Sequence, residues 1–134
     1  HVRAYDRRSS EFRDFVLARL ADARFVDGPI ADEERPDQDI QWNRVVELEL
    51  VPHPANMRNP DTIEAEYGMS EGRLVTRVRA ALVGYMLRSW NVDCTPDHSL
   101  RGGENHLWLK NRQALYGVAN LVLAPGYSEP PASR

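Results

Sequence analysis

Hydrophobic residues in the first part of the chain recur at the spacing of one helix face. Ser9 or Ser10 precedes Glu11, and this order is typical of a capped helix start. The apolar positions that follow are Phe12, Phe15, Val16, Leu20 and Ala23. This pattern predicts an amphipathic helix from residue 11 to about residue 23. The acidic, Pro-containing stretch from Asp27 to Asp39 predicts a loop after it.

The segment from Ile40 to Val51 fits two structures. Apolar and acidic residues alternate from Val46 to Leu50, as in a strand, yet the apolar positions from Trp42 onward also suit a helix. We favour the helix. Farther on, Asn59 followed by Pro60 is a good helix start, and this predicts a short helix that ends near Gly68.

Three further elements are expected in the second half. Ser70 should cap the longest helix, from Glu71 to about Arg88, and a last helix should run from Asn111 to Leu123. Residues 90–95 alternate apolar with polar side chains, which predicts extended chain. The short apolar run Leu107-Trp108-Leu109 predicts a small strand.

Size and composition indicate one compact domain without a membrane span. The chain has 134 residues and one cysteine, Cys94, which cannot form an internal disulfide. Its N-terminus is charged and no apolar run is about 18 residues long, so we expect neither a signal peptide nor a membrane partner. These features predict a cytoplasmic protein.

Charge is distributed unevenly along the chain, whose overall net charge is −3. Residues 1–70 contain nine basic and fifteen acidic residues, hence a net −6. Residues 71–134 contain eight basic and five acidic residues, hence a net +3. The second half is therefore the part whose field would attract phosphates.

An ordered set of polar residues in that half resembles the core of the HNH endonucleases, which have a ββα-metal fold. Asp97-His98 is followed by Arg101-Gly102-Gly103-Glu104-Asn105 and then by Asn111 and Asn120. The resemblance covers about residues 92–123. It implies a metal-dependent endonuclease, a hydrolase that cuts phosphodiester bonds in DNA.

The resemblance also implies a role for each residue. Asp97 and Asn120 would hold a divalent cation, Mg²⁺ or Mn²⁺, and His98 would be the catalytic general base. Asn111 would be the second catalytic residue and would orient the imidazole. The nucleic-acid-binding residues would be Arg101, Lys110 and Arg112, through the phosphates of DNA. Many family members have two CxxC pairs, which this chain lacks, so no structural zinc is expected.

The expected fold class is accordingly α+β and mostly helical. An acidic helical portion, residues 1–70, would pack on residues 71–127, which hold the long helix and the HNH-like ββα unit. Residues 128–134, rich in Pro and Ser, would form a disordered tail. A protein partner could bind through the N-terminal helical portion.

Two alternative interpretations remain open. One is a non-catalytic helical interaction module, or a helix-turn-helix DNA-binding module, within a larger assembly. Tyr67-Gly68-Met69-Ser70 and a following helix with Arg73, Arg77 and Arg79 are similar to such a motif. The other is a transition-metal site formed by Cys94, His98 and His106.

Overall fold

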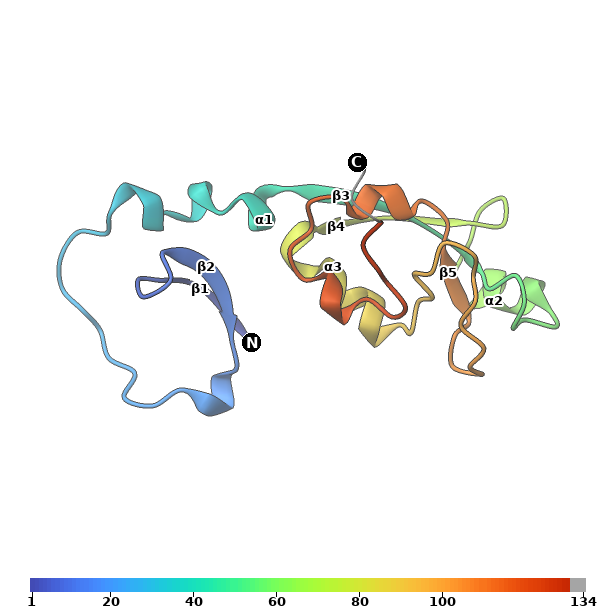
Figure 1. The fold of residues 1–134 in the computed structure, drawn as a ribbon, viewed down its shortest axis with the longest axis horizontal. Helices are drawn as coiled ribbons and strands as arrows, with labels where there is room; N and C mark the ends of the chain where they lie inside the picture. The colour runs from blue at the N-terminus through green and yellow to red at the C-terminus, as the bar shows by residue number, and fades with distance from the viewer. Residues whose placement is uncertain (131–134) are drawn as a thin grey trace. The chain divides into compact units, whose positions relative to one another are not determined.

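The computed structural model describes residues 1–130, and contact density divides the chain into two compact units, His1–Ile40 and Gln41–Arg134. Each unit has its own sheet (Figure 1). The predicted disordered tail at 128–134 lies mostly outside the described residues. No helix within residues 1–130 is long and apolar enough to cross a membrane.

The first unit is built on a β-hairpin. Strand β1 (Val2–Asp6) pairs antiparallel with β2 (Glu11–Phe15), and the Tyr5 and Phe12 rings meet edge to face with centroids 5.2 Å apart. Arg3 joins the hairpin to the end of the unit, because its guanidinium donates 2.5 and 2.9 Å hydrogen bonds to the Asp39 carboxylate. The 3₁₀ turns η1 (Leu17–Arg19), η2 (Asp32–Glu34) and η3 (Pro36–Gln38) follow the hairpin.

The second unit is a three-stranded antiparallel sheet in the order β4-β3-β5, with helices on one face (Figure 1). Helix α1 (Ile40–Asn43) leads into the central strand β3 (Val45–Pro52). Strands β4 (Leu74–Arg79) and β5 (Leu107–Leu109) are its neighbours. Helix α2 (Pro60–Glu66) lies between β3 and β4 in sequence, and α3 (Ala80–Ser89) follows β4.

Alternation along β3 decides which face is buried. Val46, Leu48 and Leu50 are at most 4% exposed, whereas Val45 and Glu47 are exposed. Successive strand residues point to opposite faces, so the even-numbered side chains face the core beneath α3. The core cluster also contains Ile63, Ala80, Val83, Leu87, Val92, Cys94, Leu107, Leu109, Leu115, Val118 and Ala124.

Several predicted helices are wrong. Residues 11–23 form β2 and η1, and the segment that we favoured as a helix at 40–51 is mainly β3. The long helix expected from Glu71 is a strand up to Arg79, and only α3 is helical. The last helix is two 3₁₀ turns, η4 (Arg112–Leu115) and η5 (Leu121–Leu123). Gly117 separates the two turns with a φ of +77° that no α-helix accommodates.

The mostly helical fold class is therefore wrong, and so is the helical character expected for residues 1–70. The short helix after Asn59 and the strand at 107–109 are confirmed. Residues 90–95 are only partly strand-like, because a single bridge joins Asp93 to Trp108. The chain is α+β, with short helices placed on antiparallel sheets.

Candidate functional site

The segment from Asp93 to Asn105, which contains the predicted catalytic residues, is organised around a buried carboxylate. Asp93 is 0% exposed, and its Oδ1 accepts hydrogen bonds from the Thr95 amide (2.8 Å) and hydroxyl (2.7 Å). Its Oδ2 accepts from the Leu100 amide at 3.1 Å and from His53 Nε2 at 2.8 Å. Four donors from three residues, Thr95, Leu100 and the distant His53, thus converge on one side chain.

His53 is a fixed donor in this network. Its side chain is fully buried, and its Nδ1 accepts the backbone N–H groups of Ala55 (3.2 Å) and Asn56 (3.1 Å). Because Nδ1 is an acceptor, the ring proton of the neutral imidazole lies on Nε2 and points at Asp93. Both ring nitrogens are therefore occupied by structural hydrogen bonds.

The pKa of Asp93 reflects these contacts. Burial raises it, but hydrogen bonds from Thr95, His53 and the Leu100 N–H together bring it below its usual value. A carboxyl group with a lowered folded-state pKa stabilises the fold above its unfolded pKa of about 3.9, and that stabilisation is lost as pH falls through the folded value.

This predicts an acid dependence that can be measured. The free energy of unfolding of the wild-type chain should exceed that of Asp93→Asn at pH 7, and the difference should shrink below about pH 4, where the unfolded carboxyl becomes protonated. Urea unfolding at pH 7, 5, 4 and 3 measures it. A difference that stays constant over this range would show that the Asp93 charge does not contribute.

The loop after Asp93 is also held from outside. The Asn56 side-chain amide donates to the carbonyl oxygens of Leu100 (2.9 Å) and Asn105 (3.1 Å). The Trp108 indole donates to the Thr95 carbonyl at 2.8 Å. These bonds fix a segment that contains two adjacent glycines and would otherwise be mobile.

The structure places Asp97 and His98 in different environments. Asp97 is exposed, whereas the His98 ring lies edge-on to Trp108 and His53, with centroids 5.4 and 5.9 Å away. Within residues 1–130, His98 Nδ1 is buried without a hydrogen-bond partner. The half-buried imidazole thus packs against the rings of Trp108 and His53.

The two asparagines are used for structure. Asn111 accepts the Glu49 N–H at 2.8 Å and donates to the Glu47 carbonyl at 2.9 Å, which extends the pairing of β3. Asn120 accepts the Gly84 N–H at 3.1 Å and donates to the Ala81 carbonyl at 2.8 Å, and so attaches η5 to α3. Their amides lie on different elements and do not converge with Asp97.

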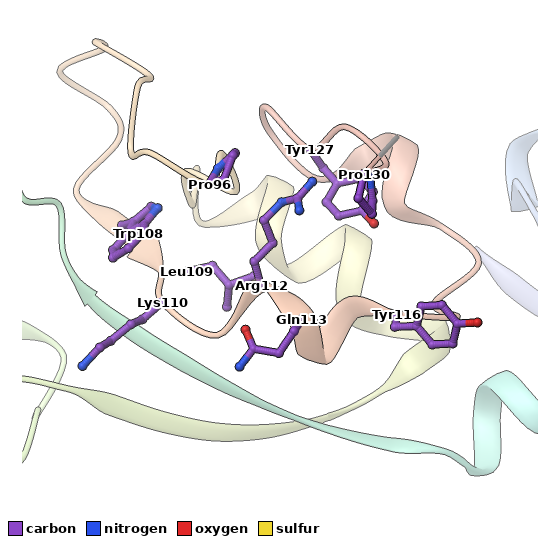
Figure 2. Close-up of a pocket in the computed structure, with 9 residues that line it drawn as sticks. All are labelled: Pro96, Trp108, Leu109, Lys110, Arg112, Gln113, Tyr116, Tyr127 and Pro130. Atoms are coloured by element: carbon purple, nitrogen blue, oxygen red, sulfur yellow. The ribbon is translucent and has the colours of Figure 1, made fainter. Parts of the chain in front are cut away.

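Two of the three predicted nucleic-acid-binding residues line a pocket, which Figure 2 shows in close-up. Its volume is about 470 Å³, and its lining residues are Pro96, Trp108, Leu109, Lys110, Arg112, Gln113, Tyr116, Tyr127 and Pro130. The Arg112 guanidinium lies 4.7 Å from the centre of the Tyr127 ring and donates to the Cys94 carbonyl. Lys110 lies 3.6 Å from the Glu49 carboxylate. Arg101 is exposed and donates to the His98 carbonyl.

The described residues contain no group of three His, Cys, Asp or Glu side chains arranged to hold a metal ion. In particular, the Cys94 thiol is buried, and desolvation raises its pKa to about 12. A thiol that stays protonated is a poor metal ligand.

The residues that organise this segment were not singled out from the sequence. His53 lies between Pro52 and Pro54 and looked like part of a connection, and Asn56 and Asp93 had no distinguishing neighbours. Their importance comes from contacts 40 or more positions apart in the chain, such as His53 with Asp93. No local spacing reports such contacts.

Comparison with known proteins gives a consistent result. A family model described as the BrxR transcriptional regulator, C-terminal dimerization domain, matches residues 45–115. The DNA-binding transcriptional repressor CapW of Escherichia coli strain KTE188 is 34% identical over 119 residues, which is 88% of this chain and 38% of that protein. CapW of Pseudomonas aeruginosa is 35% identical over 94 residues, 69% of this chain and 30% of that protein.

These matches overturn the nuclease interpretation. Residues 45–115 include Asp97, His98 and Asn111, so the family of regulators accounts for most of the segment that resembles an HNH core. The prediction of a metal-dependent endonuclease, and of a hydrolase at all, is wrong. The expectation of a divalent cation depended on that interpretation, and the alternative of a non-catalytic module in a larger assembly fits the matches better.

The chain spans less than two fifths of the length of the curated relatives that it matches. The family model, in contrast, covers more than half of the chain and extends from the start of β3 to the end of η4. The chain belongs to the family of BrxR transcriptional regulators, through their C-terminal dimerization domain.

Proposed function

We propose that residues 45–115 hold two copies of this polypeptide together, and that the polypeptide is a DNA-binding transcriptional repressor. The observation that carries the proposal is the family match, whose description is a dimerization domain and whose residues include the whole β4-β3-β5 sheet. The CapW relatives, named as DNA-binding repressors, support the second part.

The polar groups of this unit favour an architectural role over a catalytic one. Four polar side chains of this unit form hydrogen bonds with the protein's own backbone and side chains. They are those of Asp93, His53, Asn111 and Asn120. The His53 imidazole is fully buried, so it has no access to a substrate and could not act as a general base. The network instead joins His53, Asp93 and the loop that follows Asp93.

Dimerization explains how such a unit contributes to repression. Two identical DNA-contacting parts joined by a two-fold axis can occupy two half-sites at a fixed spacing, which raises affinity and selects the operator. In this proposal the protein partner is a second copy, bound through the second unit and not through a helical N-terminal portion. A repressor acts on chromosomal DNA, so the proposal keeps the cytoplasmic location.

Co-expression of two differently tagged copies of the 134-residue chain tests the first part. We expect purification through one tag to recover the other copy in comparable amount, because newly synthesised copies should pair irrespective of their tags. An unrelated tagged protein of similar size serves as the control. Recovery of the second copy at only the level of that control would overturn the proposal.

A further inference from the structure

We propose that the second copy docks on the outer face of β3 and β4, through a reciprocal pair of contacts between Glu47 of one copy and Arg77 of the other. The outer sheet face is defined as the surface formed by Val45, Glu47, Glu49, Val75, Arg77 and Arg79. This inference rests on the proposed function, because it assigns the surface by which the domain dimerizes.

The register of the sheet puts these six side chains on one surface. In the antiparallel pairing of β3 with β4, Val45 lies opposite Arg79, Glu47 opposite Arg77, and Glu49 opposite Val75. Their odd numbers place them on the side away from the core residues Val46, Leu48 and Leu50. Figure 2 shows α3 and η4 on the same side of β3 and β4.

Most of the side chains on this face are open to solvent. Val45 is 48% and Val75 46% exposed, and Glu47, Arg77 and Arg79 are also exposed. Large apolar side chains placed on a sheet face beside charged ones resemble the mixture of a subunit contact. One-sided antiparallel sheets can face water, so exposure alone does not identify the partner.

The charged side chains of the outer sheet face that lack an ion-pair partner within the described part of the chain indicate what the partner is. Glu49 is satisfied within the chain by Arg73 at 3.3 Å and Lys110 at 3.6 Å, and Arg79 lies over the Trp42 ring and donates to its carbonyl. The Glu47 carboxylate and the Arg77 guanidinium are direct cross-strand neighbours, yet among residues 1–130 neither forms an ion pair or hydrogen bond. Both charges therefore remain available to a partner.

A second copy supplies the complement by symmetry. Consider a two-fold axis that lies above the outer sheet face, parallel to the strands and midway between β3 and β4. Rotation about this axis places β4 of the second copy over β3 of the first, and β3 of the second copy over β4 of the first. Since Glu47 and Arg77 lie at the same height in the register, this operation sets Glu47 against Arg77 of the second copy and Arg77 against its Glu47. One closed, isologous contact thus pairs both charges, and the exposed valines border it.

Edge-to-edge pairing of two β4 strands is the competing way to dimerize a sheet. It would be unfavourable here because of three arginines on one face: Arg77 and Arg79 of β4, and Arg73, which directly precedes this strand. Every antiparallel register centred on a residue from Val75 to Val78 sets two arginines directly opposite each other. Like charges in that position are destabilising, and charged edge strands are a common protection against such pairing.

Charge reversal and restoration test the assignment. We expect Arg77→Glu and Glu47→Arg each to raise the dimer dissociation constant about 100-fold, because each places like charges opposite each other twice. The double variant, which exchanges the two charges, should recover to within about tenfold of the wild type. Sedimentation equilibrium on the full 134-residue chain gives the constants, and circular dichroism confirms that each variant folds.

Arg58→Glu is the matched control, because Arg58 is exposed, forms no hydrogen bond or ion pair within residues 1–130 and undergoes the same charge change. Val122→Asp probes a different surface, since Val122 is 95% exposed on η5. If the single reversals dimerize like the wild type, the outer sheet face is not the interface, and the proposed function still stands. If Val122→Asp alone dissociates the dimer, the interface lies on the α3 and η5 side. A wild-type chain that is monomeric throughout would overturn both proposals.

Discussion

Replacement of Asp93 by alanine should lower the free energy of unfolding by about 3 to 5 kcal/mol. The carboxylate accepts four hydrogen bonds and is completely buried. Its removal leaves the His53 Nε2–H and the amides of Thr95 and Leu100 buried without acceptors. Each unpaired donor costs about 1 to 3 kcal/mol, and partial entry of water into the space limits the total.

Asp97→Ala is the matched control for this prediction, since Asp97 is the same residue type four positions away but exposed. Its unfolding free energy should stay within about 0.5 kcal/mol of the wild type. Urea unfolding at pH 7, followed by tryptophan fluorescence, compares the two. Equal midpoints for Asp93→Ala and Asp97→Ala would show that the buried network does not stabilise the fold.

Gly84→Ala should destabilise the chain by about 2 kcal/mol, although a glycine-to-alanine change inside a helix ordinarily stabilises it by up to about 1 kcal/mol. A β-carbon at this position would lie only 2.9 Å from the Asn120 side chain and closer still to its backbone carbonyl. The same asparagine bonds the Gly84 N–H and the Ala81 carbonyl. The methyl group would therefore separate η5 from α3.

Thermal unfolding distinguishes the two opposing effects by sign. Gly103→Ala serves as the comparison, because an added β-carbon there meets no atom within 4 Å. We expect a lower melting temperature for Gly84→Ala and little change for Gly103→Ala. A melting temperature for Gly84→Ala at or above that of the wild type would mean that helix propensity outweighs the contact with Asn120.

Elements with strong local signals were predictable from the sequence. Asn59 and Pro60 mark the start of α2 by their backbone preferences alone. Leu107-Trp108-Leu109 is a short run of apolar residues, a pattern that favours a buried strand over a helix. For the segment after Ser70, both periods were present. Leu74, Val78 and Leu82 suit a helix face, whereas Leu74, Thr76 and Val78 alternate with Val75, Arg77 and Arg79 as in a strand.

Long-range pairing decided that ambiguity. Val78 lies opposite Val46 and Leu74 opposite Leu50, so the half-buried even-numbered side chains of β4 share the core face with those of β3, and the β4 arginines are exposed. Glu71 and Gly72, both with positive φ, form the turn that starts the strand, and no helix can pass through them.

The candidate site illustrates a different limit. The order Asp97, His98, Asn111, Asn120 is real, but the same residue types serve as a turn, a packed ring, a strand extension and a helix attachment. Asparagine is common in both catalytic and backbone-bonding roles because its amide both donates and accepts. The spacing of polar residues therefore could not distinguish a reactive cluster from a structural one.

The central claim is that the second unit joins two chains, and the solution mass of the polypeptide tests it most directly. Sedimentation equilibrium at a series of concentrations in the micromolar range should give a mass near twice the 15.3 kDa of one chain. On dilution the measured mass should fall toward that of one chain. A mass of 15.3 kDa at every concentration would contradict the account.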